Sequence, residues 1–182
     1  MEDCNEQTDK PYVLPSWRVN QSIMIAVRFL NEAGYYKDGF DYKRFILGKG
    51  IALKGYSSFK PENLKELRKV SLSLWDEGLC LVFHDRENSE KCCMIAYNDK
   101  KSVAEIMQII FHEFGHIELR HTEQSPNAEA EATLFSAIAT FLVIAEQRFH
   151  IGRLIASERG AESFFNGMRA GFMEKQDMKE AV

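Results

Sequence analysis

The segment 103–120 restricts the possible folds of this 182-residue chain more than any other, because it combines a helical pattern, an apolar middle and two histidines with a glutamate directly after that middle. Ser102 is a good N-cap and Glu105 follows three residues later, which is a capping-box pattern and predicts a helix over this segment. The turn before His112 is apolar, so the predicted helix belongs in the core. Burying two histidines and a glutamate there costs free energy unless other groups satisfy them.

The two histidines and the glutamate form an H-E-x-x-H pattern at 112–116. Four residues advance a helix by about 400°, so His112 and His116 lie one turn apart on one face and can bind the same Zn²⁺. Glu113 lies about 100° around from the first histidine, which places it beside the metal as a base for water and not as a ligand. Gly115 leaves room for a neighbouring element to pack closely. A chance match is the alternative, because the pattern specifies only three positions.

A catalytic zinc site needs a third protein ligand and an open fourth position. His121 lies about 180° around the helix from the first histidine, so it can join the site only if the helix breaks. Glu123, Glu129 and Glu131 are the other candidates, in a segment where a serine–proline pair predicts a helix start. Glu129 and Glu131 lie about 200° apart on that helix, so only one can face the metal. Glu129 is preferred, because small residues on its side allow the two helices to pack closely.

The stretch HEFGHIELRH at 112–121, followed by EAEATLFS at 129–136, resembles the ImmA/IrrE metallopeptidase family. That family's pattern is H-E-[LIF]-G-H-x-x-L-x-H and then E-x-x-A-[ND]-x-F-A. The resemblance is strong over residues 103–136 and only architectural over 19–102. In the related gluzincin pattern E-x-x-A-D the glutamate is the ligand, which implies Glu129 here. Thr133 replaces the family's Asn or Asp and no proline ends the second helix, but the metal positions are intact.

The other hydrophobic patterns predict helices, then a small sheet, then helices, which is an α+β order. Strands at 79–83 and 92–97, joined by a polar connection, predict an antiparallel hairpin. Helices are predicted at 19–33, 42–47, 61–75, from 126 past 147, and at 162–172, and a short strand at 50–56. With the resemblance, this implies a mostly helical, zincin-like domain with a small antiparallel sheet. We expect a flexible tail at 1–16 and one metallopeptidase domain at 17–182, with its core at 40–145 and C-terminal helices at 146–175.

Composition excludes several classes of protein. Hydrophobic residues make up 45% and charged residues 27%, which is typical of a folded globular chain. No run of about 18 apolar residues occurs and the first ten residues are polar, so we expect a cytoplasmic protein without a membrane partner. The net charge of −4 predicts no direct binding to nucleic acid. Residues 37–69, with nine Lys/Arg and four Asp/Glu, are either a solvated face or a docking surface for an acidic partner.

These features together predict an intracellular zinc endopeptidase in which Glu113 accepts a proton from water and passes it to the leaving amine. The strand at 92–97 is the expected edge along which a substrate strand pairs. His84 is a candidate to stabilise an oxyanion, with a solvated turn histidine as the alternative. The resemblance implies that the substrate is a helix-turn-helix repressor whose cleavage derepresses stress or mobile-element genes. A non-proteolytic regulatory module and a toxin–antitoxin component are the competing functions.

Overall fold

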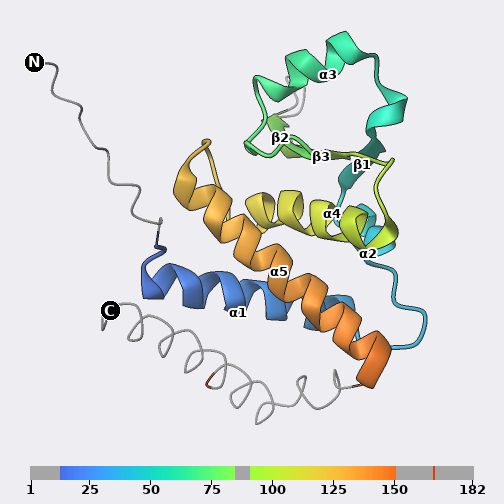
Figure 1. Ribbon diagram of the computed structural model, residues 1–182, viewed down its shortest axis with the longest axis vertical. Helices are drawn as coiled ribbons and strands as arrows, with labels where there is room; N and C mark the ends of the chain where they lie inside the picture. The colour runs from blue at the N-terminus through green and yellow to red at the C-terminus, as the bar shows by residue number, and fades with distance from the viewer. Residues whose placement is uncertain (1–12, 85–90, 151–165, 167–182) are drawn as a thin grey trace, which may run out of the picture.

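A computed structural model describes residues 13–84, 91–150 and 166 of the chain (Figure 1). Its elements are, in chain order, α1 (Ser16–Ala33), α2 (Tyr42–Gly48), β1 (Ile51–Gly55), the 3₁₀ turn η1 (Tyr56–Ser58), α3 (Pro61–Arg68), β2 (Gly78–His84), β3 (Lys91–Tyr97), α4 (Val103–Glu118) and α5 (Pro126–Phe149). The predicted α+β class is confirmed. The predictions of a tail over 1–12 and of helices beyond residue 150 lie outside the described residues.

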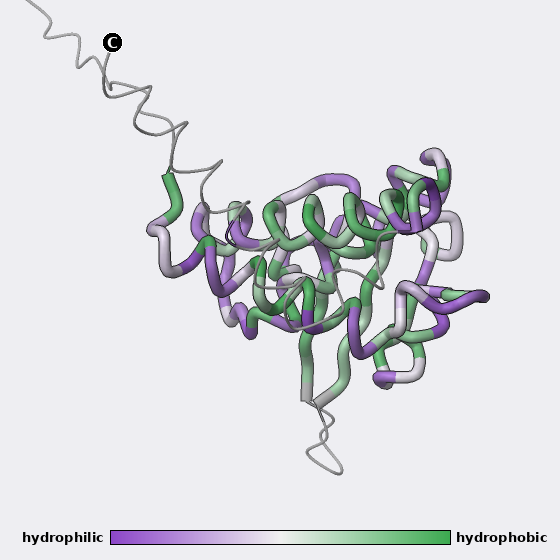
Figure 2. The backbone as a smooth tube through the Cα atoms, turned by 90° about the horizontal axis from the view of Figure 1, so that it is seen from below, coloured by the Kyte–Doolittle hydropathy of each residue, from purple (hydrophilic) through white to green (hydrophobic). Residues whose placement is uncertain are grey.

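The elements form layers around α4 (Figure 1). The sheet lies on one side of α4, which contacts β2 and β3, and α5 with α1 lies on the other side. The third helix, α3, contacts β2. Figure 2 shows the hydrophobic stretches where the helices and the sheet face one another, and hydrophilic stretches toward the periphery. The helix with the H-E-x-x-H pattern is therefore the central element of the fold, as its apolar sequence requires.

The sheet has three strands in the order β1-β3-β2. The predicted hairpin is confirmed, because β2 and β3 pair antiparallel with Cys80 opposite Ile95. The prediction of an antiparallel sheet is nevertheless wrong, because β1 pairs parallel with β3, with Ile51 opposite Cys93. The segment between these strands contains α3 and is long enough to return the chain in the parallel direction. Consequently β3 is the central strand, and the prediction of a substrate-binding edge at 92–97 is wrong.

The third helix ends at Arg68, and the prediction that it continues to residue 75 is wrong. Serine side chains explain the difference, because Ser71 Oγ accepts from the Ser73 N–H and Ser73 Oγ accepts from the Trp75 N–H. Such local bonds compete with helical hydrogen bonding. The Leu72 N–H donates to the Cys80 carbonyl of β2 instead, at 2.8 Å. Residues 71–75, which we call the cleft segment, therefore lie beside the outer edge of β2.

Four phenylalanines from three helices form the centre of the core. Phe29 of α1 has ring centroids 5.7 Å from Phe111, 4.6 Å from Phe114 and 5.8 Å from Phe135, and all four side chains are buried. Aromatic pairs at these separations contribute beyond their buried area. This cluster connects α1, α4 and α5 into one unit. It thereby gives rigid support to the two helices, α4 and α5, that carry the candidate ligands.

Close packing of α4 on α5 depends on the predicted small residues. A Cβ atom at Gly115 would lie 3.3 Å from the Cα of Ala132 and 3.2 Å from the Phe135 ring, which is tight contact. The absent side chain thus sets the distance between the two helices. By length and composition α5 could cross a membrane, but 56% of its most apolar 18-residue stretch is buried inside the fold, and the core helix of a globular protein has the same length and composition.

Candidate metal centre

The capping box at the start of α4 is present as predicted and orients the helix that carries the histidines. Ser102 Oγ accepts from the Glu105 N–H, and the Glu105 carboxylate accepts from the Ser102 N–H. His112 and His116 then lie on one face, with their Nε2 atoms 3.3 Å apart. Ser125 caps α5 in the predicted way, its Oγ accepting from the Ala128 N–H. These two helix starts determine where the site residues point.

The structure brings together the three residues predicted as ligands. A carboxylate oxygen of Glu129 lies 3.2 Å from His112 Nε2, and the other lies 3.4 Å from His116 Nε2. Donor atoms about 2.0–2.1 Å from a tetrahedral zinc are roughly 3.3–3.4 Å from one another. The two Glu129 distances involve different carboxylate oxygens, and one donor atom from each of the three residues lies within 4.8 Å of the others. The three side chains therefore have the chemistry of a group that can hold one metal ion.

The protonation states of His116 and Glu129 suit a metal. Burial, reinforced by the neighbouring His112, lowers the pKa of His116 to about 3. The imidazole is therefore neutral near pH 7, which is the form that binds a metal. Burial acts to raise the pKa of Glu129, but hydrogen bonds from His112 and from the Leu74 N–H outweigh it and the net shift is downward. The Glu129 carboxylate is therefore ionised.

Glu113 lies beside this group, fully buried, at the position predicted for a base. Neither carboxylate oxygen has a hydrogen-bond partner of acceptable geometry among the described residues. Burial raises the pKa of Glu113 well above its usual range; the Ser73 side chain opposes the shift and the Glu129 charge reinforces it. Buried polar groups are rarely left without partners in native proteins. An orphaned carboxylate next to three metal-binding side chains fits a centre that holds a metal and water.

A glycine makes room for this carboxylate. Gly78 is the first residue of β2, and a Cβ atom there would come within 2.7 Å of Glu113 Cγ and Cδ. Any larger residue would displace the Glu113 side chain, since ordinary contacts between carbon atoms are about 3.5–4.0 Å. The sequence reasoning did not identify Gly78, although its position at the start of an apolar strand after a polar turn is the available signal.

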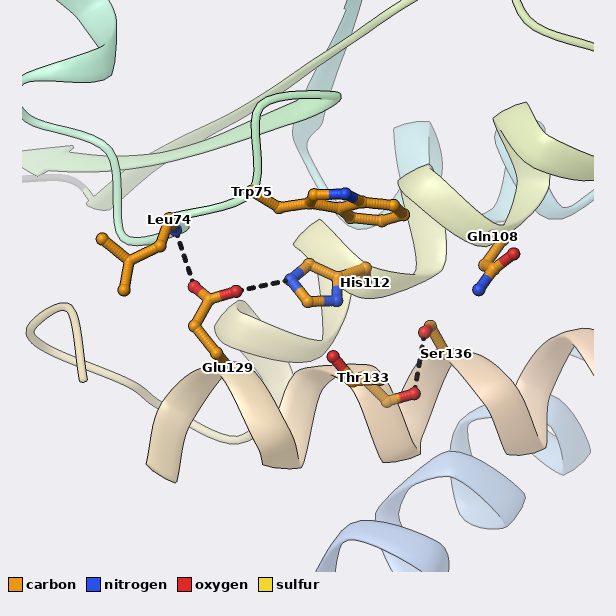
Figure 3. A pocket seen from close by; sticks show the side chains of 7 residues that line it. All are labelled: Leu74, Trp75, Gln108, His112, Glu129, Thr133 and Ser136. Carbon is orange, nitrogen blue, oxygen red and sulfur yellow. Dashed lines mark hydrogen bonds and ion pairs between the residues drawn. The ribbon is translucent and has the colours of Figure 1, made fainter. Parts of the chain in front are cut away.

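The cleft segment covers one side of the site (Figure 3). The Leu74 N–H donates to a Glu129 carboxylate oxygen at 2.7 Å, and the Trp75 ring lies edge-on to His112 at a centroid distance of 4.9 Å. The Gln124 side chain holds the segment by donating to the Ser71 carbonyl at 2.8 Å. Because the prediction placed these residues in a helix, it missed both contacts. A serine at every second position, 71 and 73, was the signal against that helix.

A cavity of about 310 Å³ opens from the site between α4, α5 and the cleft segment (Figure 3). Its walls combine two apolar side chains with polar groups of both helices: Leu74, Trp75, Gln108, His112, Glu129, Thr133 and Ser136. The cavity is large enough for one amino-acid side chain next to the metal-binding group. Thr133, the departure from the family pattern, lines this cavity and not the metal-binding group.

The other candidates from the sequence lie elsewhere. Glu131 faces away from Glu129, as the helical angle requires, and contacts His121 at 2.9 Å. Glu123 is exposed in the turn between α4 and α5. His84 ends β2, but its side chain lies outside the described residues. His150 is the exposed C-cap of α5.

Comparisons of the chain with protein-family models, with curated protein sequences and with solved structures give no match. The interpretation of the site therefore depends on its own geometry and on the local sequence pattern.

Proposed function

We propose that the chain is a zinc-dependent endopeptidase whose centre consists of His112, His116 and Glu129, with Glu113 as the catalytic base. One observation supports this most: an orphaned, fully buried carboxylate lies beside two imidazoles and a carboxylate whose donor atoms are close enough to share one metal ion. A centre that is only structural gains nothing from such a base. Two histidines and one carboxylate leave a coordination position open, as catalytic zinc sites do.

Zinc, when bound, lowers the pKa of water and polarises a carbonyl group. Glu113 would accept a proton from water and deliver it to the nitrogen of the leaving amine. Burial raises the pKa of Glu113, which makes its carboxylate a stronger proton acceptor for the first step. The hydrogen bond from Leu74 keeps the Glu129 carboxylate in place while Glu113 exchanges its proton.

The edge of the sheet next to this site is β2 and not β3. At Cys80 this edge is already occupied, because Leu72 donates to its carbonyl and Ser71 Oγ accepts from its N–H at 3.2 Å. A peptide can therefore pair with β2 at that residue only if the cleft segment moves away. This arrangement favours a restricted substrate over general digestion of unfolded chains.

The motif resemblance supports a helix-turn-helix repressor as that substrate, and the protein itself is proposed not to bind DNA. The basic segment 37–69 is the surface that could contradict this. Several of its charges are engaged within the chain, since Lys49, Arg68 and Lys69 form ion pairs with acidic residues. Lys43 lies 5.0 Å from the centre of the Tyr97 ring. These pairs reduce the free positive charge available for phosphates.

Metal analysis tests the centre directly. The purified chain should contain about one zinc ion, and Glu129→Ala and His116→Ala should lose most of it. Glu131→Ala should keep more zinc than Glu129→Ala, because Glu131 is on the same helix but faces away from the metal-binding group and contacts His121. Full zinc content in a His112→Ala/His116→Ala double variant would contradict the assignment.

Replacing the base separates catalysis from metal binding. Glu113→Gln keeps the size of the side chain but cannot accept the proton, so it should retain zinc and lose turnover by at least about 10²-fold. Undiminished cleavage by this variant would remove Glu113 from the mechanism.

The substrate proposal requires a repressor encoded beside this chain. Incubation with zinc should cut that repressor at one position and release it from its operator, and a chelator or Glu113→Gln should prevent both. In a mobility-shift assay at near-physiological salt, this chain alone should form no complex with DNA. Release without cleavage would favour a non-proteolytic regulatory module. Scattered fragments from any unfolded protein would indicate a general peptidase.

A further inference from the structure

We propose that Arg18, Glu131 and His121 form a hydrogen-bonded chain, the outer triad, that positions His116 and thereby sets the affinity of the centre for zinc. The proposal rests on the metal centre proposed above and assigns a role to three residues that are not ligands. These residues come from α1, from α5 and from the turn after α4, so the triad also connects three parts of the fold to one ligand.

The contacts of the triad are continuous. His116 Nδ1 lies 3.0 Å from His121 Nδ1, and His121 Nε2 lies 2.9 Å from a Glu131 carboxylate oxygen. The other carboxylate oxygen of Glu131 accepts a hydrogen bond from Arg18 at 3.0 Å. Among the described residues, the buried His116 ring thus has one nitrogen toward the ligands and the other toward the triad.

With a metal on His116 Nε2, only one arrangement of protons satisfies every group of the triad. A lone pair on His116 Nε2 is needed for a metal, so the proton of this neutral ring is on Nδ1 and is donated to His121 Nδ1. His121 then carries its own proton on Nε2 and donates it to Glu131. The reverse arrangement would direct a His121 lone pair at the Glu131 carboxylate and an N–H of His116 at the metal position. The negative charge of Glu131 therefore selects the tautomer of His116 that can bind a metal.

The turn after α4 explains how His121 reaches its partner. The His121 N–H donates to the His116 carbonyl at 3.0 Å, and the Arg120 N–H donates to the Ile117 carbonyl at 3.1 Å. This is the hydrogen-bond pattern of a Schellman motif, which ends a helix by folding the chain back over its last turn. Arg120 has the required positive φ of 59°. The helix thus breaks at the point where a continuous helix would have carried His121 to the opposite face.

Burial gives the triad its strength. Side-chain exposure is 6% for Glu131 and 9% for His121, and it rises to 32% only at Arg18. A carboxylate that is so deeply buried is costly unless it is paired and hydrogen-bonded. Here Glu131 has a guanidinium on one side and an imidazole N–H on the other. The same low polarity strengthens its orienting effect on the two rings.

Zinc affinity is the measurement that tests the triad, determined by competition with a chromophoric chelator on the purified full chain. His121→Phe keeps a ring of similar size without nitrogen atoms, and Glu131→Gln keeps the shape without the charge. Each should weaken zinc binding by roughly 10–100-fold, the usual effect of losing an outer partner of a metal-bound histidine. Because both side chains act through the same series of hydrogen bonds, the double variant should lose no more zinc affinity than His121→Phe alone.

Val143→Ala is the control for general destabilisation. Val143 is buried on α5, the helix that also carries Glu131, but it lies away from the site. Its truncation should therefore lower the stability of the metal-free protein and leave the zinc affinity unchanged. Urea unfolding of the metal-free variants shows whether each one folds. If His121→Phe does not fold, Arg18→Gln at the partly exposed end replaces it, with a smaller but measurable loss of affinity.

The outcomes separate the triad from the centre itself. Unchanged zinc affinity in folded His121→Phe and Glu131→Gln, with loss in Glu129→Ala, would overturn the triad and leave the metal centre standing. Unchanged zinc affinity in Glu129→Ala and His116→Ala would instead overturn the centre. Equal weakening by Val143→Ala and by the triad variants would also overturn the proposal, because it would reduce the effect to stability.

Discussion

Gly78→Ala provides a test of the geometry around the catalytic base. The new Cβ atom would lie 2.7 Å from two carbon atoms of Glu113, so one of the two groups must move by about 1 Å to restore an ordinary contact. Glu113 is fully buried, which prevents its side chain from swinging out into solvent. Inserting a methyl group into such a site costs about 1–3 kcal/mol. A displacement of about 1 Å at a catalytic group is associated with losses of about 10²-fold in rate.

The assay is a double-mutant cycle on the stability of the metal-free protein, so that metal binding does not contribute to the measurement. Urea unfolding is measured for the wild type, Gly78→Ala, Glu113→Ala and the double variant. Gly78→Ala should lower the free energy of unfolding in the wild type and have no cost once Glu113 is truncated. The coupling energy should be about 1–3 kcal/mol.

Gly48→Ala is the matched control, because a Cβ atom at this residue of α2 meets nothing within 4 Å. It should be neutral or stabilise by up to about 1 kcal/mol through the helix preference of alanine. Additive effects of Gly78→Ala and Glu113→Ala, within about 0.5 kcal/mol, would refute the argument. In addition, turnover should fall in Gly78→Ala while zinc content is retained, since the three atoms nearest the new methyl group all belong to Glu113 and not to a ligand.

Three further predictions concern the core and the cleft segment. The buried Tyr35 hydroxyl has no hydrogen-bond partner within the described part of the chain, so Tyr35→Phe should raise the free energy of unfolding in urea by about 1 kcal/mol at pH 7. Burial raises the pKa of Tyr35 from 10.0 to about 12; the folded state therefore disfavours the phenolate, and stability should fall between these pH values, less so in Tyr35→Phe. Gly115→Ala should destabilise by about 1–3 kcal/mol, because the Cα of Ala132 cannot move aside, and an unchanged urea midpoint would contradict this. Gln124→Ala should speed amide hydrogen exchange at Leu72 by loosening the cleft segment, whereas unchanged protection would show that other bonds hold it.

Local patterns in the sequence determined the central helix and the geometry of the predicted ligands. The capping box at Ser102 and the cap at Ser125 involve neighbours within three residues, so they do not depend on the rest of the fold. Helical spacing alone places His112 and His116 on one face. The same spacing separates Glu129 from Glu131, and the structure brings the first of these to the histidines.

The remaining features depend on contacts between segments that are distant in the chain. The sheet is mixed because β1 pairs with β3 across about 40 residues, and no local pattern specifies such a partner. The cleft segment leaves the helical conformation because Leu72 and Leu74 find hydrogen-bond acceptors on β2 and α5. His121 reaches His116 because the chain reverses at Arg120. A glycine usually occupies this position of the turn, so the sequence lacks the usual signal for it. Helical periodicity predicts the face on which a residue lies only while the helix continues. Where the helix ends is decided by tertiary contacts.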